Sequence, residues 1–178
     1  MLANFRVFPI LSAITLLFAC QVTHAGNGSA SDAASVALPL VAAGLSLYHD
    51  DGDGLWQLAK SEGATLVVTE VLKVSVREKR PNGQDNRSFP SRHASVAFSA
   101  AHFMQVRGGW AYGIPAYILA AGVAADRVHL REHYAKDVIA GAVVGIASST
   151  YFTDKPYRVS MGYLPGDRAI LAQLSMDW

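Results

Sequence analysis

Five apolar segments, separated by short runs of glycine, proline, aspartate and basic residues, limit the folds open to this chain more than any other feature. Their apolar residues recur at helical rather than alternating spacing. Small residues in the last segment, such as Gly141 and Gly145, permit close approach of two helices. We therefore expect an all-α fold, a helical bundle of about five helices, with segments at residues 33–48, 55–76, 92–106, 110–125 and 136–151.

The C-terminal residues follow a different period. Apolar and polar residues alternate over 172–178 and, more loosely, over 158–163, and Pro165-Gly166 lies between these stretches. This pattern predicts a short C-terminal β-hairpin within residues 156–178. The helical domain is expected at residues 33–155, after a small, polar and flexible start at 26–32.

The N-terminus has the pattern of a secretory signal. Arg6 precedes an apolar run, and small residues follow at Thr23 and Ala25, so residues 1–25 are predicted to be a cleaved signal peptide. We therefore expect an exported protein, periplasmic or envelope-associated. A lipobox-like sequence ending at Cys20 offers an alternative, in which that cysteine is lipidated. Cys20 is the only cysteine, so core burial, not a disulfide, must stabilise the mature chain.

Whether the apolar helices form a core or enter a membrane stays open at this stage. Hydrophobic residues make up 51% of the chain, yet the apolar runs stop near about sixteen residues, where a span needs about eighteen or more. We expect peripheral or partial membrane association, with the helix at 33–48 and the hairpin at Pro165 as contacts. A net charge of +1 without a basic stripe argues against nucleic acid as a partner.

Three short clusters of basic and imidazole residues point to phosphate chemistry. Arginine can hold two phosphate oxygens with its planar guanidinium, and lysine adds a compact positive charge. Free backbone N–H groups at the start of a helix also favour an anion. The clusters are Lys73 with Arg80 and Pro81, residues 90–93 (Pro-Ser-Arg-His, with Ser91 as a helix cap), and Arg127 with His133 and Asp137.

Spacing within the clusters predicts which side chains meet. Lys73 and Arg80 are seven positions apart, two helical turns, so both can face one side. His133 and Asp137 are four apart, one turn, so the carboxylate can hold one ring nitrogen and leave the other free to attack phosphorus. His93 is the candidate acid for the leaving group.

Two other histidines and an acidic loop are given structural roles. His102 and His129 are interpreted as structural or pocket-wall residues. The acidic loop at 49–54 does not fit a calcium-binding EF-hand, because His49 and Lys60 occupy positions where carboxylates are needed. It is predicted to cap the next helix.

The scattered carboxylates and the absence of a Cys/His motif predict that the protein uses no metal and no cofactor. Vanadate is expected to be an inhibitor.

The three clusters resemble the signature of the type 2 phosphatidic acid phosphatase superfamily, which also includes bacterial class A acid phosphatases and vanadium haloperoxidases. Residues 73–81 are similar to its Lys-x6-Arg-Pro motif, residues 90–93 to Pro-Ser-Gly-His, and residues 126–137 to Ser-Arg-x5-His-x3-Asp. The resemblance implies a helical bundle, a phosphohistidine intermediate on His133 and acid catalysis by His93. It also implies phosphate binding by Lys73, Arg80, Ser91, Arg92 and Arg127.

Two positions depart from that signature. Arg92 replaces the usual glycine and adds a cation that either contacts phosphate or seals the pocket. Asp126 replaces the usual serine before Arg127. Its carboxylate would repel phosphate, so it either points away and braces Arg127 or weakens the site.

We therefore expect an exported, metal-independent phosphatase acting on phosphomonoesters. Lipid phosphates, isoprenoid pyrophosphates and soluble nucleotides would all suit the cationic site. One alternative is a vanadate-dependent haloperoxidase, since the same residues would bind vanadate through His133. Another is a non-catalytic envelope lipoprotein with a relic site.

Overall fold

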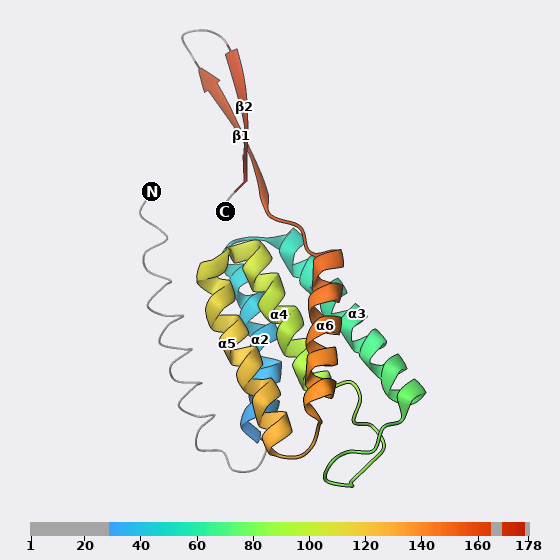
Figure 1. Cartoon of the computed structure of the whole chain (residues 1–178). Coiled ribbons are helices and arrows are strands. Elements are labelled where there is room, and N and C mark those ends of the chain that lie inside the picture. The colour runs from blue at the N-terminus through green and yellow to red at the C-terminus, as the bar shows by residue number, and fades with distance from the viewer. Residues whose placement is uncertain (1–28, 165–168, 177–178) are drawn as a thin grey trace.

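The structure, a computed structural model, describes residues 29–164 and 169–176, so the predicted signal peptide and Cys20 lie outside the described residues. Five helices in this part of the chain run alternately up and down, and a two-stranded hairpin extends beyond one end of the bundle (Figure 1). The predicted helical bundle is confirmed. The helices are α2 (Ser29–Tyr48), α3 (Gly52–Val76), α4 (Arg92–Gly108), α5 (Trp110–His129) and α6 (Ala135–Phe152).

Short polar residues define several helix ends. Asp51 caps α3, because its carboxylate accepts a hydrogen bond from the Gly54 N–H at 2.9 Å. Ser91 caps α4 in the same way, with the Ala94 N–H 3.4 Å from its hydroxyl. The predicted capping roles of the acidic loop and of Ser91 are therefore confirmed. At its other end α3 stops at Arg77, which has a left-handed φ of 50°.

Two helices, α2 and α5, extend furthest beyond their predicted segments. The start of α2 is at Ser29, so the flexible start predicted at 26–32 is wrong for residues 29–32, which form its first turn. The end of α5 is at His129, four residues past the predicted boundary. Both extensions contain polar residues whose partners come from other helices, and a periodic apolar pattern carries no information about such contacts.

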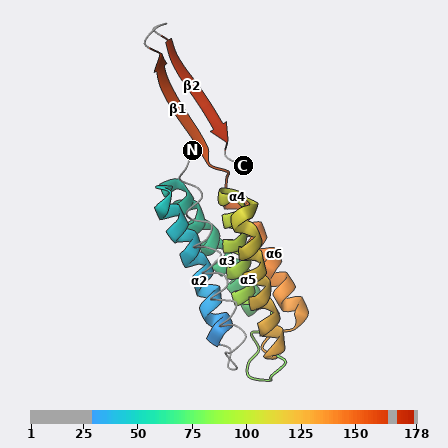
Figure 2. The same cartoon turned by 90° about the vertical axis from the view of Figure 1, so that its left-hand side faces the viewer.

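Helix α4 lies at the centre of the bundle and packs against the other four helices (Figures 1 and 2). Its contact with α6 depends on two glycines. A Cβ atom at Gly145 would lie 2.1 Å from the Ser95 carbonyl oxygen, and one at Gly141 would lie 2.5 Å from the Ser91 carbonyl oxygen. The predicted close approach through small residues of α6 is therefore confirmed.

Small residues make up most of the interior of the bundle, and many large apolar side chains are exposed. Alanine dominates the apolar core, and the seam beside α3 is lined by buried Ser61, Thr65, Thr69, Ser95 and Ser99. Many large apolar side chains instead face outward. Exposed examples are Val36 and Leu40 on α2, Val67 and Val71 on α3, Ile114 and Ile118 on α5, and Ile139 and Val143 on α6.

One helix among the described residues, Ala30–Tyr48, is long and apolar enough to cross a membrane. Its mean hydropathy reaches 1.5 over an 18-residue window, of which 33% is buried inside the bundle. By length alone the other helices are also long, with 25, 17, 20 and 18 residues in α3 to α6. These helices are longer than the apolar runs seen in the sequence, because polar residues form the ends of the helices.

The C-terminal strands are β1 (Tyr157–Leu164) and β2 (Ala169–Met176). They pair antiparallel, with Tyr157 opposite Met176 and Leu164 opposite Ala169. The hairpin continues from the end of α6 and lies at the opposite end of the bundle from the loop between α3 and α4 (Figure 1).

Candidate active site

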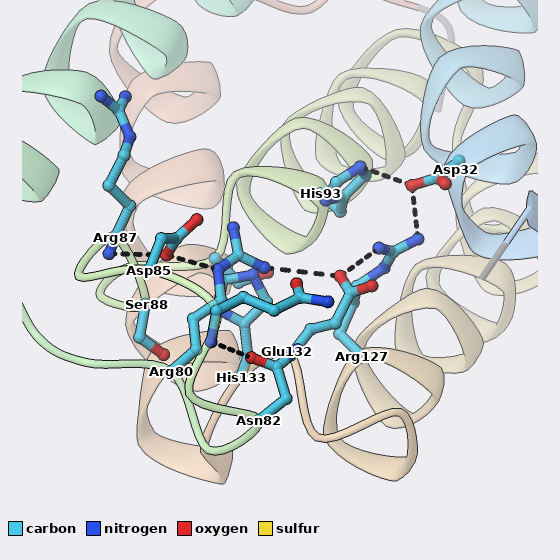
Figure 3. A network of polar contacts seen from close by, with 12 residues as sticks. Asp32, Arg80, Asn82, Asp85, Arg87, Ser88, His93, Arg127, Glu132 and His133 are labelled. Atoms are coloured by element: carbon cyan, nitrogen blue, oxygen red, sulfur yellow. Dashed lines mark hydrogen bonds and ion pairs between the residues drawn. The ribbon is translucent and has the colours of Figure 1, made fainter. Parts of the chain in front are cut away.

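The three predicted clusters meet at one end of the bundle. Figure 3 shows Arg80, His93, Arg127 and His133 from these clusters close to one another. This end holds the N-termini of α2, α4 and α6, the C-termini of α3 and α5, and the two loops at 77–91 and 130–134. The loops are joined by a hydrogen bond from the Asn82 N–H to the Arg131 carbonyl oxygen at 2.9 Å. Three helix N-termini at one place supply partial positive charge, which favours an anion there.

His133 and Asp137 lie together, although not on one helical face as predicted. His133 precedes α6, and Asp137 is in the first turn of that helix, where its carboxylate accepts the Tyr134 N–H at 2.9 Å. The prediction failed locally because Asp137 caps the helix, which starts only after His133. Even so, His133 Nδ1 is 3.7 Å from Asp137 Oδ2. The same carboxylate oxygen accepts the Ser88 hydroxyl at 2.5 Å, which keeps Asp137 in place.

The surroundings of His133 favour its neutral form. The side chain is 2% exposed. Burial lowers the pKa of His133 to about 3, and the positive charges of Lys73 and Arg80 add to this effect. A neutral imidazole has the lone pair that a nucleophile needs.

His93 is in the first turn of α4 and faces α2. Its Nε2 lies 2.8 Å from Asp32 Oδ1. Burial lowers the pKa of His93, and the charge of Arg127 lowers it further, whereas the charge of Asp32 opposes both effects. An acid in this position therefore depends on nearby anions for its proton.

Arg127 is 1% exposed and is held by residues from two other segments. Its guanidinium donates to Glu132 and to Asp32, each at 2.6 Å, and to the Ser31 hydroxyl at 2.5 Å. Ser31 in turn donates to Asp126. Asp126 therefore contacts Arg127 indirectly, through the Ser31 hydroxyl, which agrees with the bracing role considered for this departure from the signature.

Lys73 and Arg80 approach the site from different local structures. Lys73 is in the last turn of α3 and donates to the carbonyl oxygens of Arg87 at 2.8 Å and Pro90 at 2.6 Å. Burial lowers its pKa to about 8, with a further contribution from the charge of Arg80.

Arg80 lies in the loop after Val76 and not on the helix that carries Lys73. The predicted pairing of the two side chains along one helix is therefore wrong, because the chain leaves the helix at the left-handed residue Arg77. Arg80 contacts Asp85 at 2.8 Å and Glu132 at 3.5 Å.

Two residues of the second cluster, Ser91 and Arg92, are predicted to bind phosphate, and they differ in exposure. Ser91 is fully buried, and its N–H donates to the Asp137 carbonyl oxygen at 2.9 Å, so it links α4 to α6. Arg92 is exposed at the start of α4, and its charge contributes to lowering the pKa of His93. A contact of either side chain with phosphate stays a prediction.

The two remaining histidines lie apart from this cluster. His102 is on α4 and joins Tyr117 at 2.8 Å and Thr150 at 3.0 Å, so it links three helices. His129 is exposed at the end of α5. The contacts of His102 agree with the structural interpretation made from the sequence, whereas a structural or pocket-wall role for His129 stays a prediction.

Sequence reasoning missed two carboxylates of this network. Asp32 belongs to the segment that was expected to be flexible, and Glu132 is the neighbour of His133. Each accepts from Arg127. Glu132 could have been noticed as an acidic side chain beside His133, whereas no motif or spacing marks Asp32. Within the described ranges no group of three or more His, Cys, Asp or Glu side chains has the geometry of a metal site.

Sequence comparison links the chain to known phosphatases. Residues 54–159 match the PAP2 superfamily. The chain is 31% identical over 152 residues to the lipid A 4'-phosphatase of Helicobacter pylori, a match that covers 79% of this chain and 73% of that protein. It is 32% identical over 98 residues to the lipid A 1-phosphatase of Porphyromonas gingivalis, covering 51% of this chain but only 22% of that longer protein.

Two solved structures share the fold. Aquifex aeolicus LpxE superposes with a TM-score of 0.58 at 21% identity, covering 83% of this chain and 90% of that one. A transmembrane PAP2-type phosphatidylglycerolphosphate phosphatase from Bacillus subtilis gives a TM-score of 0.56, also at 21% identity, and covers 81% and 84% of the two chains.

Proposed function

This chain belongs to the PAP2 superfamily, and we propose that it is a metal-independent phosphatase that hydrolyses lipid phosphomonoesters through a phosphohistidine intermediate. The observation that carries the proposal is the convergence of a buried imidazole, a second imidazole and three cations at one end of the bundle. Figure 3 shows both imidazoles and the two arginines among these cations. The cations are Lys73, Arg80 and Arg127.

In the first step, the Nε2 atom of His133 attacks phosphorus, and the P–O bond to the alcohol breaks. Asp137, beside Nδ1, stabilises the positive charge that develops on the imidazole. His93 gives its proton to the leaving oxygen. The cations hold the three other phosphate oxygens, whose charge is largest in the transition state.

In the second step, a water molecule attacks phosphorus and the P–N bond to His133 breaks. His93, now neutral, takes the proton of that water. Inorganic phosphate leaves, and both histidines return to their starting states. The positive side chains supply the charge stabilisation that a metal supplies in other phosphatases, which is why we propose a reaction without one.

A lipid substrate is supported by the relatives and by the surface of the bundle. The two curated relatives are named as lipid A phosphatases. In addition, the helices expose valine, leucine and isoleucine side chains and pack through alanine, glycine, serine and threonine, as helices do in lipid.

We propose that the bundle lies in a bilayer with the active site at one face. Four exposed aromatic residues gather at the helix ends opposite the site, namely Tyr48, Trp56, Trp110 and Tyr151. Tryptophan and tyrosine prefer the interface between lipid and water. The polar site end, comprising residues 29–32, 73–93 and 126–137, then lies outside the apolar span.

Export stays part of this proposal. The predicted signal ends at Ala25, shortly before α2 begins with the site residues of its first turn, so export would leave the active site on the exported side. Fractionation of cells tests this: we expect the protein in the membrane fraction, and complete release by osmotic shock would contradict membrane residence.

The function is tested by phosphate release from a short-chain phosphatidate by the purified full-length protein in detergent. We expect His133→Ala to abolish turnover and Asp137→Asn to slow it by about a hundredfold or more. His129→Ala is the matched control, because this imidazole is exposed and contacts no residue of the site described above. Labelled phosphate should be trapped on the wild-type protein and not on His133→Ala.

Three further conditions complete the test. Activity should persist in excess EDTA, and vanadate should inhibit by imitating the five-coordinate transition state. Loss of activity on chelation that magnesium or zinc restores would overturn the metal-free mechanism. A clear preference for a nucleotide monophosphate over the phosphatidate would overturn the lipid assignment.

A further inference from the structure

One carboxylate from outside the three clusters contacts both His93, the proposed acid, and Arg127. Arg127 is one of the three cations proposed to hold phosphate, here called the phosphate clamp. Asp32 is in the first turn of α2, upstream of the residues that match the superfamily. A single oxygen, Oδ1, lies 2.8 Å from His93 Nε2 and 2.6 Å from Arg127 Nη2 (Figure 3). It therefore joins α2 to α4 and α5 at the reaction centre.

We propose that Asp32 is the positioning residue for the general acid: its carboxylate orients the His93 ring and holds the proton-carrying form of His93 beside the leaving oxygen. The proposal rests on the phosphatase function proposed above. With Nε2 bound to Asp32, Nδ1 is the nitrogen left to deliver a proton to the alcohol.

Burial makes this contact stronger than an ordinary surface ion pair. The Asp32 side chain is 55% exposed, but the Arg127 side chain is 2% exposed and that of His93 24%. An attraction between partly desolvated charges is screened less than one in open water. Ser31, the neighbour of Asp32, also accepts from Arg127, so the start of α2 is held against the clamp at two points.

The charges around His93 explain why it needs such a partner. Arg127 on α5 and Arg92 on α4 both disfavour a proton on His93, as does burial, while Asp32 on α2 and Glu132 in the loop before α6 favour it. His133, from the same loop, is neutral in this environment. Glu132 is engaged by Arg127 and Arg80, which leaves Asp32 as the carboxylate in direct contact with the ring.

The test compares Asp32→Asn with wild type on two substrates that differ in their need for an acid. An alkyl phosphate, such as a short-chain phosphatidate, releases a basic alkoxide that must be protonated, whereas p-nitrophenyl phosphate releases a stable phenolate. We expect kcat on the alkyl phosphate to fall about tenfold or more, and kcat on p-nitrophenyl phosphate to fall by less than about threefold. KM should change less than kcat on the alkyl substrate.

The pH profile gives an independent readout. Loss of the carboxylate charge should move the alkaline limb of the kcat profile to lower pH by about one unit. Asp32→Glu, which restores the charge, should recover part of the activity and of the profile. Asp53→Asn, the same change at an exposed position at the other end of the bundle, should behave as wild type.

Equal losses on both substrates, with an unchanged pH profile, would overturn the role of Asp32 and show that it only stabilises the fold. The ratio of the two rates is measured within one variant, so a smaller folded fraction does not alter it. Failure of the phosphatase proposal would look different, because the wild-type protein would then release no phosphate from either substrate, or His133→Ala would retain the wild-type rate.

Discussion

At the scale of single residues, Glu132 contacts two of the three cations that we propose hold phosphate. Its carboxylate accepts from Arg127 at 2.6 Å and lies 3.5 Å from Arg80, so one anion bridges two cations of the clamp. A bound phosphate must therefore compete with Glu132 for the same guanidinium groups. We expect this competition to weaken binding of inorganic phosphate and to favour its release after hydrolysis.

We predict that Glu132→Gln binds inorganic phosphate several times more tightly than wild type, because it removes the competing charge. The inhibition constant of phosphate in a steady-state assay measures the change. Glu78→Gln is the control, since its carboxylate is paired with Lys136 and its removal also deletes one charge at this end of the bundle. Weaker phosphate inhibition in Glu132→Gln would contradict the competition.

The environment of His133 predicts how activity depends on pH. A nucleophile must be unprotonated, and burial lowers the pKa of His133 to about 3, so protonation should remove the nucleophile only in strong acid. After correction for the substrate's own second ionisation, near about pH 6, the acid limb of kcat/KM should lie below about pH 5.

Lys73→Met removes one of the charges that lower this pKa, so the acid limb should move upward even though binding also weakens. A wild-type limb near the ordinary histidine value of about 6.5 would show that the imidazole is not held neutral in the resting enzyme.

At the scale of helices, the contact between α4 and α6 determines the geometry of the site. Helix α4 carries Ser91 and His93, and α6 follows His133 and carries Asp137, so any displacement between them separates acid from nucleophile. The two helices pack closely because residue 145 is a glycine. The Ser95 carbonyl oxygen lies so near to it that no side-chain atom would fit between them.

We predict that Gly145→Ala lowers the free energy of unfolding by about 1–3 kcal/mol, and that it also lowers kcat. Gly122→Ala on α5 is the matched control, because nothing lies within 4 Å of its Cβ position. That change should be neutral or stabilise by up to about 1 kcal/mol. Thermal unfolding of both variants in detergent tests the prediction, and equal stability of the two would contradict the close contact.

At the scale of the whole molecule, the outward-facing apolar side chains and the aromatic ends predict how the bundle meets lipid. Trp56 and Trp110 are 66% and 63% exposed at the end opposite the active site. Lipids brominated near the headgroup should quench the fluorescence of both more strongly than lipids brominated deep in the chains. Trp178, the third tryptophan of the chain, is replaced by phenylalanine throughout, and replacement of Trp56 or Trp110 then separates the two signals. Emission unaffected by any brominated lipid would place these side chains in water.

Much of this architecture could be predicted without coordinates because its causes are local. Helical spacing of apolar residues identified five helices. Ser91 and the acidic loop at 49–54 identified the caps of two of them, and Gly141 with Gly145 identified a close helix contact. The three clusters identified the cations and both histidines, since each motif is a short run whose order is visible in the chain. These features depend on residues within a few positions of one another.

The tertiary structure alone decided how these side chains are held. Asp32 reaches Arg127 across 95 positions, and Ser88 reaches Asp137 across 49, so no spacing rule could pair them. Arg80 and His133 lie outside helices, where the sequence spacing suggested helical faces, because a left-handed residue and a capping carboxylate end or delay the helix. Partners of buried charges are selected by the packing of distant helices, and that packing exists only once the chain has folded.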